Sequence, residues 1–153
     1  MNTLGPLLCF AVPEEATALP RHIRDRILFT GIGAKNARRA LQSISLKQRP
    51  EMILTSGFAG GLNPQLPLGT VVWEAEKNFP LIDALRNSSG HPGTFHCANK
   101  VAITVDDKAR LWRETKCDCV EMESGAIRKL AREEGIPAAT MRVISDAAEE
   151  DLP

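Results

Sequence analysis

The sequence lacks an excess of charge of either sign, because 19 lysines and arginines balance 19 aspartates and glutamates. A nucleic-acid-binding protein needs a clustered basic excess to contact phosphates, so this balance argues against that class. No apolar run approaches the ~20 residues of a membrane span. The short apolar stretch over residues 1–12 follows no basic segment and precedes Glu14 and Glu15, which is unlike a secretion signal. We therefore expect a cytoplasmic protein that binds neither nucleic acid nor a membrane.

Cysteine is also scarce, with four in 153 residues. This number is too small for a disulfide scaffold, and in a reducing compartment the side chains are expected to be free thiols. The one close pair, Cys117 and Cys119, is separated by a single residue, which is not the spacing of a zinc site. In an apolar stretch this pattern favours a strand in which cysteine acts as a small hydrophobic residue. We expect neither a metal nor a cofactor.

Short apolar runs alternate with segments in which apolar residues recur at helical spacing. The runs predict strands over residues 4–12, 26–30, 52–56, 70–73, 101–105, 117–121 and 137–144. Helices are predicted from Pro13, over 34–46, within 78–100 ahead of a loop of turn formers, over 106–114 with Asp106 as the cap, and over 124–133. Strands that alternate with helices predict an α/β fold, here a three-layer α/β/α domain with a mostly parallel sheet. The length suits a single domain over residues 1–153.

Acidic and small polar residues follow several of the predicted strands. The first strand leads to Glu15, the third to a glycine-rich loop, the sixth to Glu121 and Glu123, and the last to Asp146. In open α/β sheets, ligands bind in the crevice beyond the carboxyl ends of the strands. Carboxylates gathered there would repel one another unless each is paired or hydrogen-bonded, an arrangement that suits acid–base chemistry. Each residue alone is more simply explained as a helix cap, so the hypothesis depends on their occurring together.

Four motifs in a fixed order make the pattern specific. They are Ser56-Gly-Phe-Ala-Gly-Gly-Leu62, Leu68-Gly-Thr-Val-Val72, Val120-Glu-Met-Glu-Ser124 and Arg142-Val-Ile-Ser-Asp146. In this order the chain resembles the nucleoside phosphorylase/nucleosidase superfamily, and most closely its methylthioadenosine/S-adenosylhomocysteine nucleosidase-like branch. The resemblance covers about residues 4–148 and implies a phosphorylase/hydrolase-like fold, in which the mostly parallel central sheet is mixed. The chain is shorter than typical members, mainly between residues 72 and 101 and after residue 146.

The resemblance implies catalytic roles for two residues and contacts to substrate for several more. Glu15 matches the base that activates water, and Asp146 matches the acid that protonates or hydrogen-bonds the purine N7. Ser145 would orient the carboxyl group of Asp146. Glu123 would accept hydrogen bonds from two ribose hydroxyls, which a carboxylate can do, and Met122 would pack on the ribose face.

The glycine-rich loop and the start of the acidic motif complete the implied substrate site. Phe58, Ala59 and Gly60 lie in the loop that approaches base, ribose and nucleophile, where small residues allow close backbone contact. Glu121 belongs to the same implied binding set, and Arg142 is expected to be its ion-pair partner rather than a catalyst. The partner implied is a small-molecule nucleoside, and the family resemblance also implies a homodimer.

Three functions stay open at this point. Hydrolysis is favoured over phosphorolysis, because phosphorylases of this superfamily typically carry an arginine just before the glycine loop, where this chain has Leu54, Thr55 and Ser56. Arg21 and Arg24 follow the first strand and could reach an anion, which keeps a phosphate-dependent phosphorylase as the alternative. The third hypothesis is a catalytically weak nucleoside-binding remnant, since the chain ends soon after Asp146 and a displaced acid would lose much of its effect.

Overall fold

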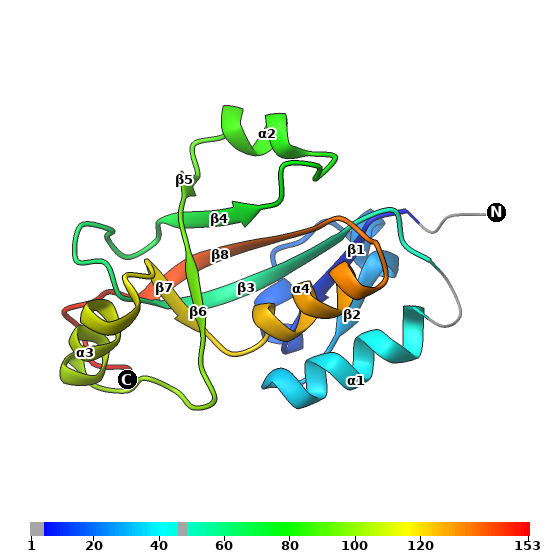
Figure 1. Ribbon diagram of the computed structural model, residues 1–153. Coiled ribbons are helices and arrows are strands. Elements are labelled where there is room, and N and C mark those ends of the chain that lie inside the picture. The colour runs from blue at the N-terminus through cyan, green and yellow to red at the C-terminus, as the bar shows by residue number, and fades with distance from the viewer. Residues whose placement is uncertain (1–4, 46–48) are drawn as a thin grey trace.

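The computed structural model describes residues 5–45 and 49–153 and contains one eight-stranded sheet with helices on both faces (Figure 1). The strands are β1 (Leu7–Phe10), β2 (Ile27–Phe29), β3 (Ile53–Gly61), β4 (Val71–Ala75), β5 (His91–Pro92), β6 (Phe95–Cys97), β7 (Cys119–Glu121) and β8 (Ala138–Asp146). The α-helices are α1 (Ala34–Ser45), α2 (Ile82–Asn87), α3 (Val105–Thr115) and α4 (Ser124–Glu133). Two 3-10 helices, η1 (Pro13–Ala16) and η2 (Arg21–Arg26), lie between β1 and β2.

The sheet is mixed and mostly parallel, as the sequence predicts. Its main path is β2-β1-β3-β8-β4-β5, and β7 joins it beside β3 and carries β6. The neighbours are parallel except where β7 meets β3 and where β4 meets β8. The two long strands, β3 and β8, run parallel from the pair Ile53–Ala138 to the pair Gly60–Asp146, with a register shift after Ala59. The carboxyl ends of β1, β3 and β8 therefore meet at one edge, beside β7.

Helices cover the two faces of the sheet unequally. On one face, α1 and α4 pack side by side over the strands, and their buried residues recur at helical spacing, as in Ile127, Leu130 and Ala131 of α4 (Figure 1). On the other face, the short helix α2 packs over Met52 and Ala139 of the opposite core cluster. The structure confirms a three-layer α/β/α fold, in which one helical layer is a single short helix.

Three predictions of local structure are wrong. Residues 57–61, predicted as a glycine-rich loop, continue strand β3. The short strands β5 and β6 lie in the segment predicted as a loop after the helix within 78–100, and one predicted strand is absent.

Residues 101–105 form no strand, because Thr104 and Asp107 form a reciprocal capping box that begins α3 instead. The Thr104 side chain accepts a hydrogen bond from the backbone N–H of Asp107 at 3.1 Å, and the carboxylate of Asp107 accepts one from the Thr104 N–H at 3.3 Å. The cap is therefore Thr104 rather than Asp106. The first residue predicted for β1, Leu4, and the last predicted for α1, Leu46, lie outside the described residues.

Candidate active site

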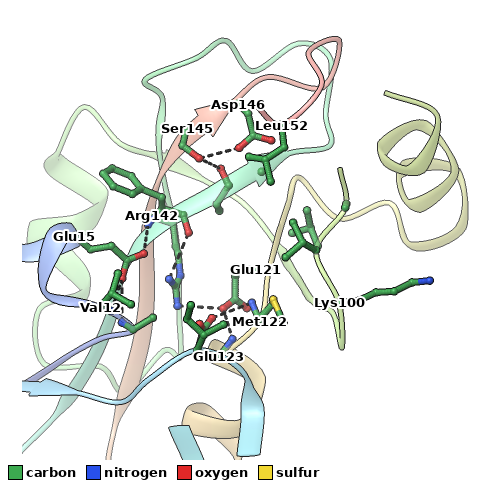
Figure 2. Close-up of a pocket in the computed structure, with 18 residues that line it drawn as sticks. Val12, Glu15, Lys100, Glu121, Met122, Glu123, Arg142, Ser145, Asp146 and Leu152 are labelled. Atoms are coloured by element: carbon green, nitrogen blue, oxygen red, sulfur yellow. Dashed lines mark hydrogen bonds and ion pairs between the residues drawn. The ribbon is translucent and has the colours of Figure 1, made fainter. Parts of the chain in front are cut away.

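A cavity of about 310 Å³ opens at the edge where β1, β3 and β8 end, next to β7 (Figure 2). The structure brings every site residue predicted from the sequence to its walls. These residues are Glu15, Phe58, Ala59, Gly60, Glu121, Met122, Glu123, Ser145 and Asp146. Figure 2 shows the carboxylates of Glu15, Glu123 and Asp146 on different sides of the same space. The expectation that strand ends gather these carboxylates in one cleft is therefore confirmed.

Among the described residues, the hydrogen-bond donors to the carboxylate of Glu15 are all backbone N–H groups. One oxygen, Oε2, accepts hydrogen bonds from the N–H of Ala11 at 3.0 Å and of Val12 at 3.4 Å. The other, Oε1, accepts from the N–H of Phe58 in β3 at 3.1 Å. The approach depends on Gly57, where φ is +138° and an added Cβ would lie 2.5 Å from Oε1 of Glu15. Two strands thus fix this carboxylate at the mouth of the cavity.

Glu123 lies on another wall of the same cavity and is only 6% exposed. Its Oε1 accepts a hydrogen bond from the N–H of Gly33 at 3.4 Å, and its Oε2 accepts one from the N–H of Met122 at 3.1 Å. Burial raises the pKa of Glu123 above its ordinary value of 4.5; the positive charge of Arg142 opposes this shift, and the negative charge of Glu121 adds to it. A ligand hydroxyl that donates to this carboxylate would favour its charged form.

Glu121 and Arg142 form a buried ion pair beneath Glu123. The Nη2 atom of Arg142 lies 3.1 Å from Oε2 of Glu121, and each side chain is 2% exposed. The same Glu121 oxygen accepts hydrogen bonds from the N–H groups of Glu123 and Ser124, each at 2.8 Å, and its other oxygen accepts from the Ser124 hydroxyl. Arg142 also donates to the Thr55 hydroxyl at 3.0 Å. The pairing expected for Arg142 is confirmed, and the carboxylate of Glu121 is occupied by protein donors.

Asp146 ends β8 and is held by two side chains. The Ser145 hydroxyl donates to Oδ1 of Asp146 at 2.8 Å, as the resemblance implies. The Nζ atom of Lys108 lies 2.5 Å from Oδ2, in an ion pair that the sequence reasoning missed. A signal was present, because Lys108, Leu111 and Thr115 recur at helical spacing on one side of α3. A lysine at such spacing can be a buried ion-pair partner as well as a solvated residue.

Apolar side chains from segments that the motifs do not cover complete the cavity walls. Ile32 follows β2, Val101 and Ala102 precede α3, and Leu152 lies in the chain after β8. Sequence reasoning missed this group, since isolated apolar residues in loops carry no spacing pattern. Phe79 and Phe95, two aromatic residues of the segment between residues 72 and 101, pack in core clusters instead of lining the cavity.

The described part of the chain has neither a metal-binding cluster nor a membrane-spanning helix. Within residues 5–45 and 49–153, no group of three histidine, cysteine or acidic side chains is arranged to hold a metal ion. No helix in these ranges is long and apolar enough to cross a membrane. Burial raises the pKa of the Cys9 and Cys119 thiols to about 12, which keeps both protonated and unreactive at neutral pH.

Comparison with known proteins gives matches to one family and one fold. A family model described as the phosphorylase superfamily matches residues 81–153. No curated protein matches the sequence. Among solved structures, the chain is similar to a futalosine hydrolase mutant of Helicobacter pylori, with a TM-score of 0.81 and 17% identity over 97% of this chain and 88% of that chain.

Two nucleosidase structures are also similar. The 5'-methylthioadenosine/S-adenosyl homocysteine nucleosidase of Campylobacter jejuni gives a TM-score of 0.80 and 17% identity over 97% of this chain and 88% of that chain. The corresponding enzyme of S. pneumoniae, solved with a transition-state inhibitor, gives a TM-score of 0.82 and 16% identity over 95% of this chain and 87% of that chain. Identities this low establish the fold rather than the activity. Residues 81–153 thus match the phosphorylase superfamily, and the chain as a whole has the fold of these nucleosidases, in agreement with the resemblance that the motifs indicate.

Proposed function

We propose that the protein is a nucleosidase, an N-glycosyl hydrolase that cleaves the bond between ribose and base in a purine-type nucleoside. The observation that carries this proposal is the placement of Glu15, Glu123 and Asp146 around one cavity, each held by its own set of hydrogen-bond donors. Three carboxylates fixed on different walls can serve a nucleophile, a sugar and a leaving group separately. The similar structures are those of nucleosidases and a futalosine hydrolase, which agrees with this chemistry.

The reaction needs one proton removed and one proton supplied. Water attacks C1′ of the ribose, and Glu15 accepts the proton that the water loses. The C1′–N bond breaks, and its electron pair goes to the base. Asp146 faces the departing base: its carboxyl group, once protonated, passes the proton to the base as negative charge develops there and returns to the carboxylate that pairs with Lys108. The products are the free base and the free sugar, and no co-reactant besides water is consumed.

The remaining residues bind the nucleoside or hold the residues that do. Glu123 accepts hydrogen bonds from the ribose hydroxyls, and Met122 packs against the sugar. Phe58, Ala59 and Gly60 form the wall beside the bond that breaks. Glu121 holds Glu123 in place. Its carboxylate accepts hydrogen bonds from the N–H groups of Glu123 and Ser124 and pairs with the guanidinium of Arg142.

The charges around the cavity favour water over phosphate as the nucleophile. Of the described residues lining it, the cationic ones are Arg142 and Lys100. Arg142 is engaged with Glu121 and Thr55, and the Lys100 side chain points away from the carboxylates in Figure 2. Arg24, which the sequence left open as an anion ligand, lines a different hollow next to β2. Of the two cations in the described walls, Arg142 is thus committed to protein partners and Lys100 is turned away from the carboxylates, which favours water.

We propose further that the protein is a cytoplasmic homodimer. Around the cavity mouth, Ile32, Phe58 and Val101 are 59%, 49% and 48% exposed. Apolar side chains grouped at a cavity mouth are typical of a surface that a ligand or partner covers. The balanced charge and the free thiols agree with a reducing compartment. Light scattering coupled to gel filtration measures the mass in solution; the mass of a single chain would contradict the dimer.

The activity is tested with a panel of purine nucleosides that differ in base and 5′ substituent. Free base and reducing sugar are measured with and without phosphate. We expect both products in equal amounts without phosphate, because hydrolysis releases a reducing sugar whereas phosphorolysis forms a non-reducing sugar 1-phosphate. Base release that requires phosphate would identify a phosphorylase. Binding of a nucleoside analogue without any base release would identify a nucleoside-binding remnant.

A further inference from the structure

Lys108 is a fully buried charged residue, although it lies near the start of a surface helix. It stands one turn into α3, and its backbone N–H donates to the carbonyl of the N-cap residue Thr104 at 3.1 Å. The side chain is 0% exposed and points from α3 toward the end of β8. An ammonium group is costly to bury unless good acceptors surround it. Its surroundings therefore indicate what it does.

The ammonium of Lys108 has an acceptor for each of its three protons. Nζ lies 2.5 Å from Oδ2 of Asp146 and donates to the carbonyl oxygens of Ala147 at 2.9 Å and Glu150 at 2.6 Å. Lysine has three donors and no acceptor, so this geometry satisfies the group completely. Burying an ion pair is often no better for stability than burying apolar residues of the same size. Stability alone therefore gives little reason for a lysine at this position.

One acceptor of Lys108, Asp146, lines the proposed active site, and the other two follow it in the chain. Because the Ser145 hydroxyl already holds Oδ1 of Asp146 and Lys108 holds Oδ2, both oxygens of the carboxyl group are fixed. The chain beyond Asp146 is tied back to α3 by the carboxylate of Asp151, which accepts from the N–H of Val105 at 2.7 Å. That segment carries Leu152 into the cavity wall.

We propose that Lys108 is a positioning residue for departure of the base. Its ammonium sets the direction of the Asp146 carboxyl group and anchors residues 147–150 behind it. This inference rests on the proposed nucleosidase function, and it adds a residue from α3, outside the motifs, to the machinery of that site. A carboxyl group displaced by about 1 Å can lose on the order of 100-fold in rate, so the anchor matters more for turnover than for binding.

The first test replaces Lys108 by methionine, which keeps the length of the side chain and removes the charge. We expect kcat for base release to fall roughly ten- to a hundredfold, while KM changes less than about threefold. The matched control is Asp151→Asn, which weakens the other tie between the same segment and α3 but leaves Lys108 and Asp146 in place. We expect this control to keep kcat within about threefold of the wild type.

The second test is a double-mutant cycle with Asp146→Asn, and it also covers failure of Lys108→Met to fold, since the double variant buries no unpaired charge. If Lys108 acts through Asp146, the double variant turns over no more slowly than Asp146→Asn alone. A double variant clearly slower than Asp146→Asn, or Lys108→Met with the wild-type kcat, would overturn the inference while the nucleosidase function stands. A wild-type protein that releases no base would overturn the proposed function first, and the inference with it.

Discussion

Two carboxylates on opposite sides of the cavity are held in different ways. Glu15 is fixed by backbone N–H groups of residues 11, 12 and 58, whereas Asp146 is fixed by the side chains of Ser145 and Lys108. A backbone cradle depends on how β1 and β3 lie together and survives most single substitutions. A side-chain brace depends on two particular residues. The Glu15 side should therefore be sensitive to backbone changes and the Asp146 side to side-chain changes.

The largest effect is expected on the Asp146 side. Asp146→Asn keeps the size and a hydrogen-bonding group but cannot transfer a proton, so kcat should fall on the order of 10²–10⁴-fold, with affinity for a nucleoside analogue little changed. The variant should also lose as much as ~3 kcal/mol of stability, because Lys108 is left without its counter-charge. Turnover and melting temperature are measured on one preparation. A lower melting temperature with wild-type turnover would show that Asp146 has a structural role only.

The Glu15 side of the cavity is tested by a substitution that disturbs the backbone next to Glu15. Gly57→Ala places a Cβ 2.5 Å from Oε1 of Glu15 and 2.9 Å from Nη1 of Arg142, so Glu15 must move and kcat should fall by about 100-fold. Gly69→Ala is the control, because Gly69 also has a positive φ, +83°, but its Cβ would meet nothing within 4 Å. Both variants share the backbone strain, so equal activity in the two would mean that contact with Glu15 does not matter.

Glu123 tests the sugar side of the cavity. Glu123→Ala removes the acceptor group proposed for the ribose hydroxyls, and the net loss of one charge-assisted hydrogen bond of this kind costs ~1.5–3 kcal/mol. Affinity for a non-hydrolysable nucleoside should therefore fall roughly ten- to a hundredfold. Calorimetry with the nucleoside analogue and with the free base separates the two halves of the ligand. Equal loss of affinity for both ligands would show that Glu123 does not recognise the sugar.

The smallest expected effect is on the pH dependence of stability. The pKa of Glu123 is raised in the folded protein, so an unfolded chain releases this proton near its ordinary value of 4.5 and the folded chain only at higher pH. Ionisation of Glu123 therefore lowers stability as pH rises through this window, and the loss persists above it. Glu123→Gln cannot ionise and so does not lose this stability. In urea unfolding, the free energy of unfolding of Glu123→Gln minus that of the wild type should therefore be larger at about pH 7.5 than at about pH 5. A pH-independent difference would contradict the raised pKa.

The comparison also explains how much of the site the sequence could predict. Glu15, Glu123 and Asp146 each follow a strand, and because parallel strands end at one edge of a sheet, their meeting could be predicted from their places in the chain. The ion pair of Arg142 with Glu121 could be predicted from two short motifs. Helical spacing groups Lys108 with Leu111 and Thr115 on one side of α3, but the partners of its ammonium could not be predicted, since they depend on how α3 packs against the chain after β8. Contacts between distant segments leave no local pattern.

Most of the fold could also be predicted from local patterns in the sequence, although three local predictions were wrong. The alternation of strands and helices predicted the three layers, and α4 begins and ends at the predicted bounds, 124–133. The strand predicted over residues 101–105 failed, because its β-branched residues lie next to a capping box that begins a helix. Local propensity was outweighed there by a specific pair of hydrogen bonds.

The central claim is that Glu15 activates water for attack on the sugar. Its most direct test compares base release by the wild type and by Glu15→Gln at saturating nucleoside in phosphate-free buffer, with analogue affinity measured on both proteins. We expect the wild type to release base and reducing sugar together, and Glu15→Gln to be slower by on the order of 10²–10⁴-fold, with affinity within about threefold. A Glu15→Gln protein that hydrolyses nucleoside at the wild-type rate would contradict the account.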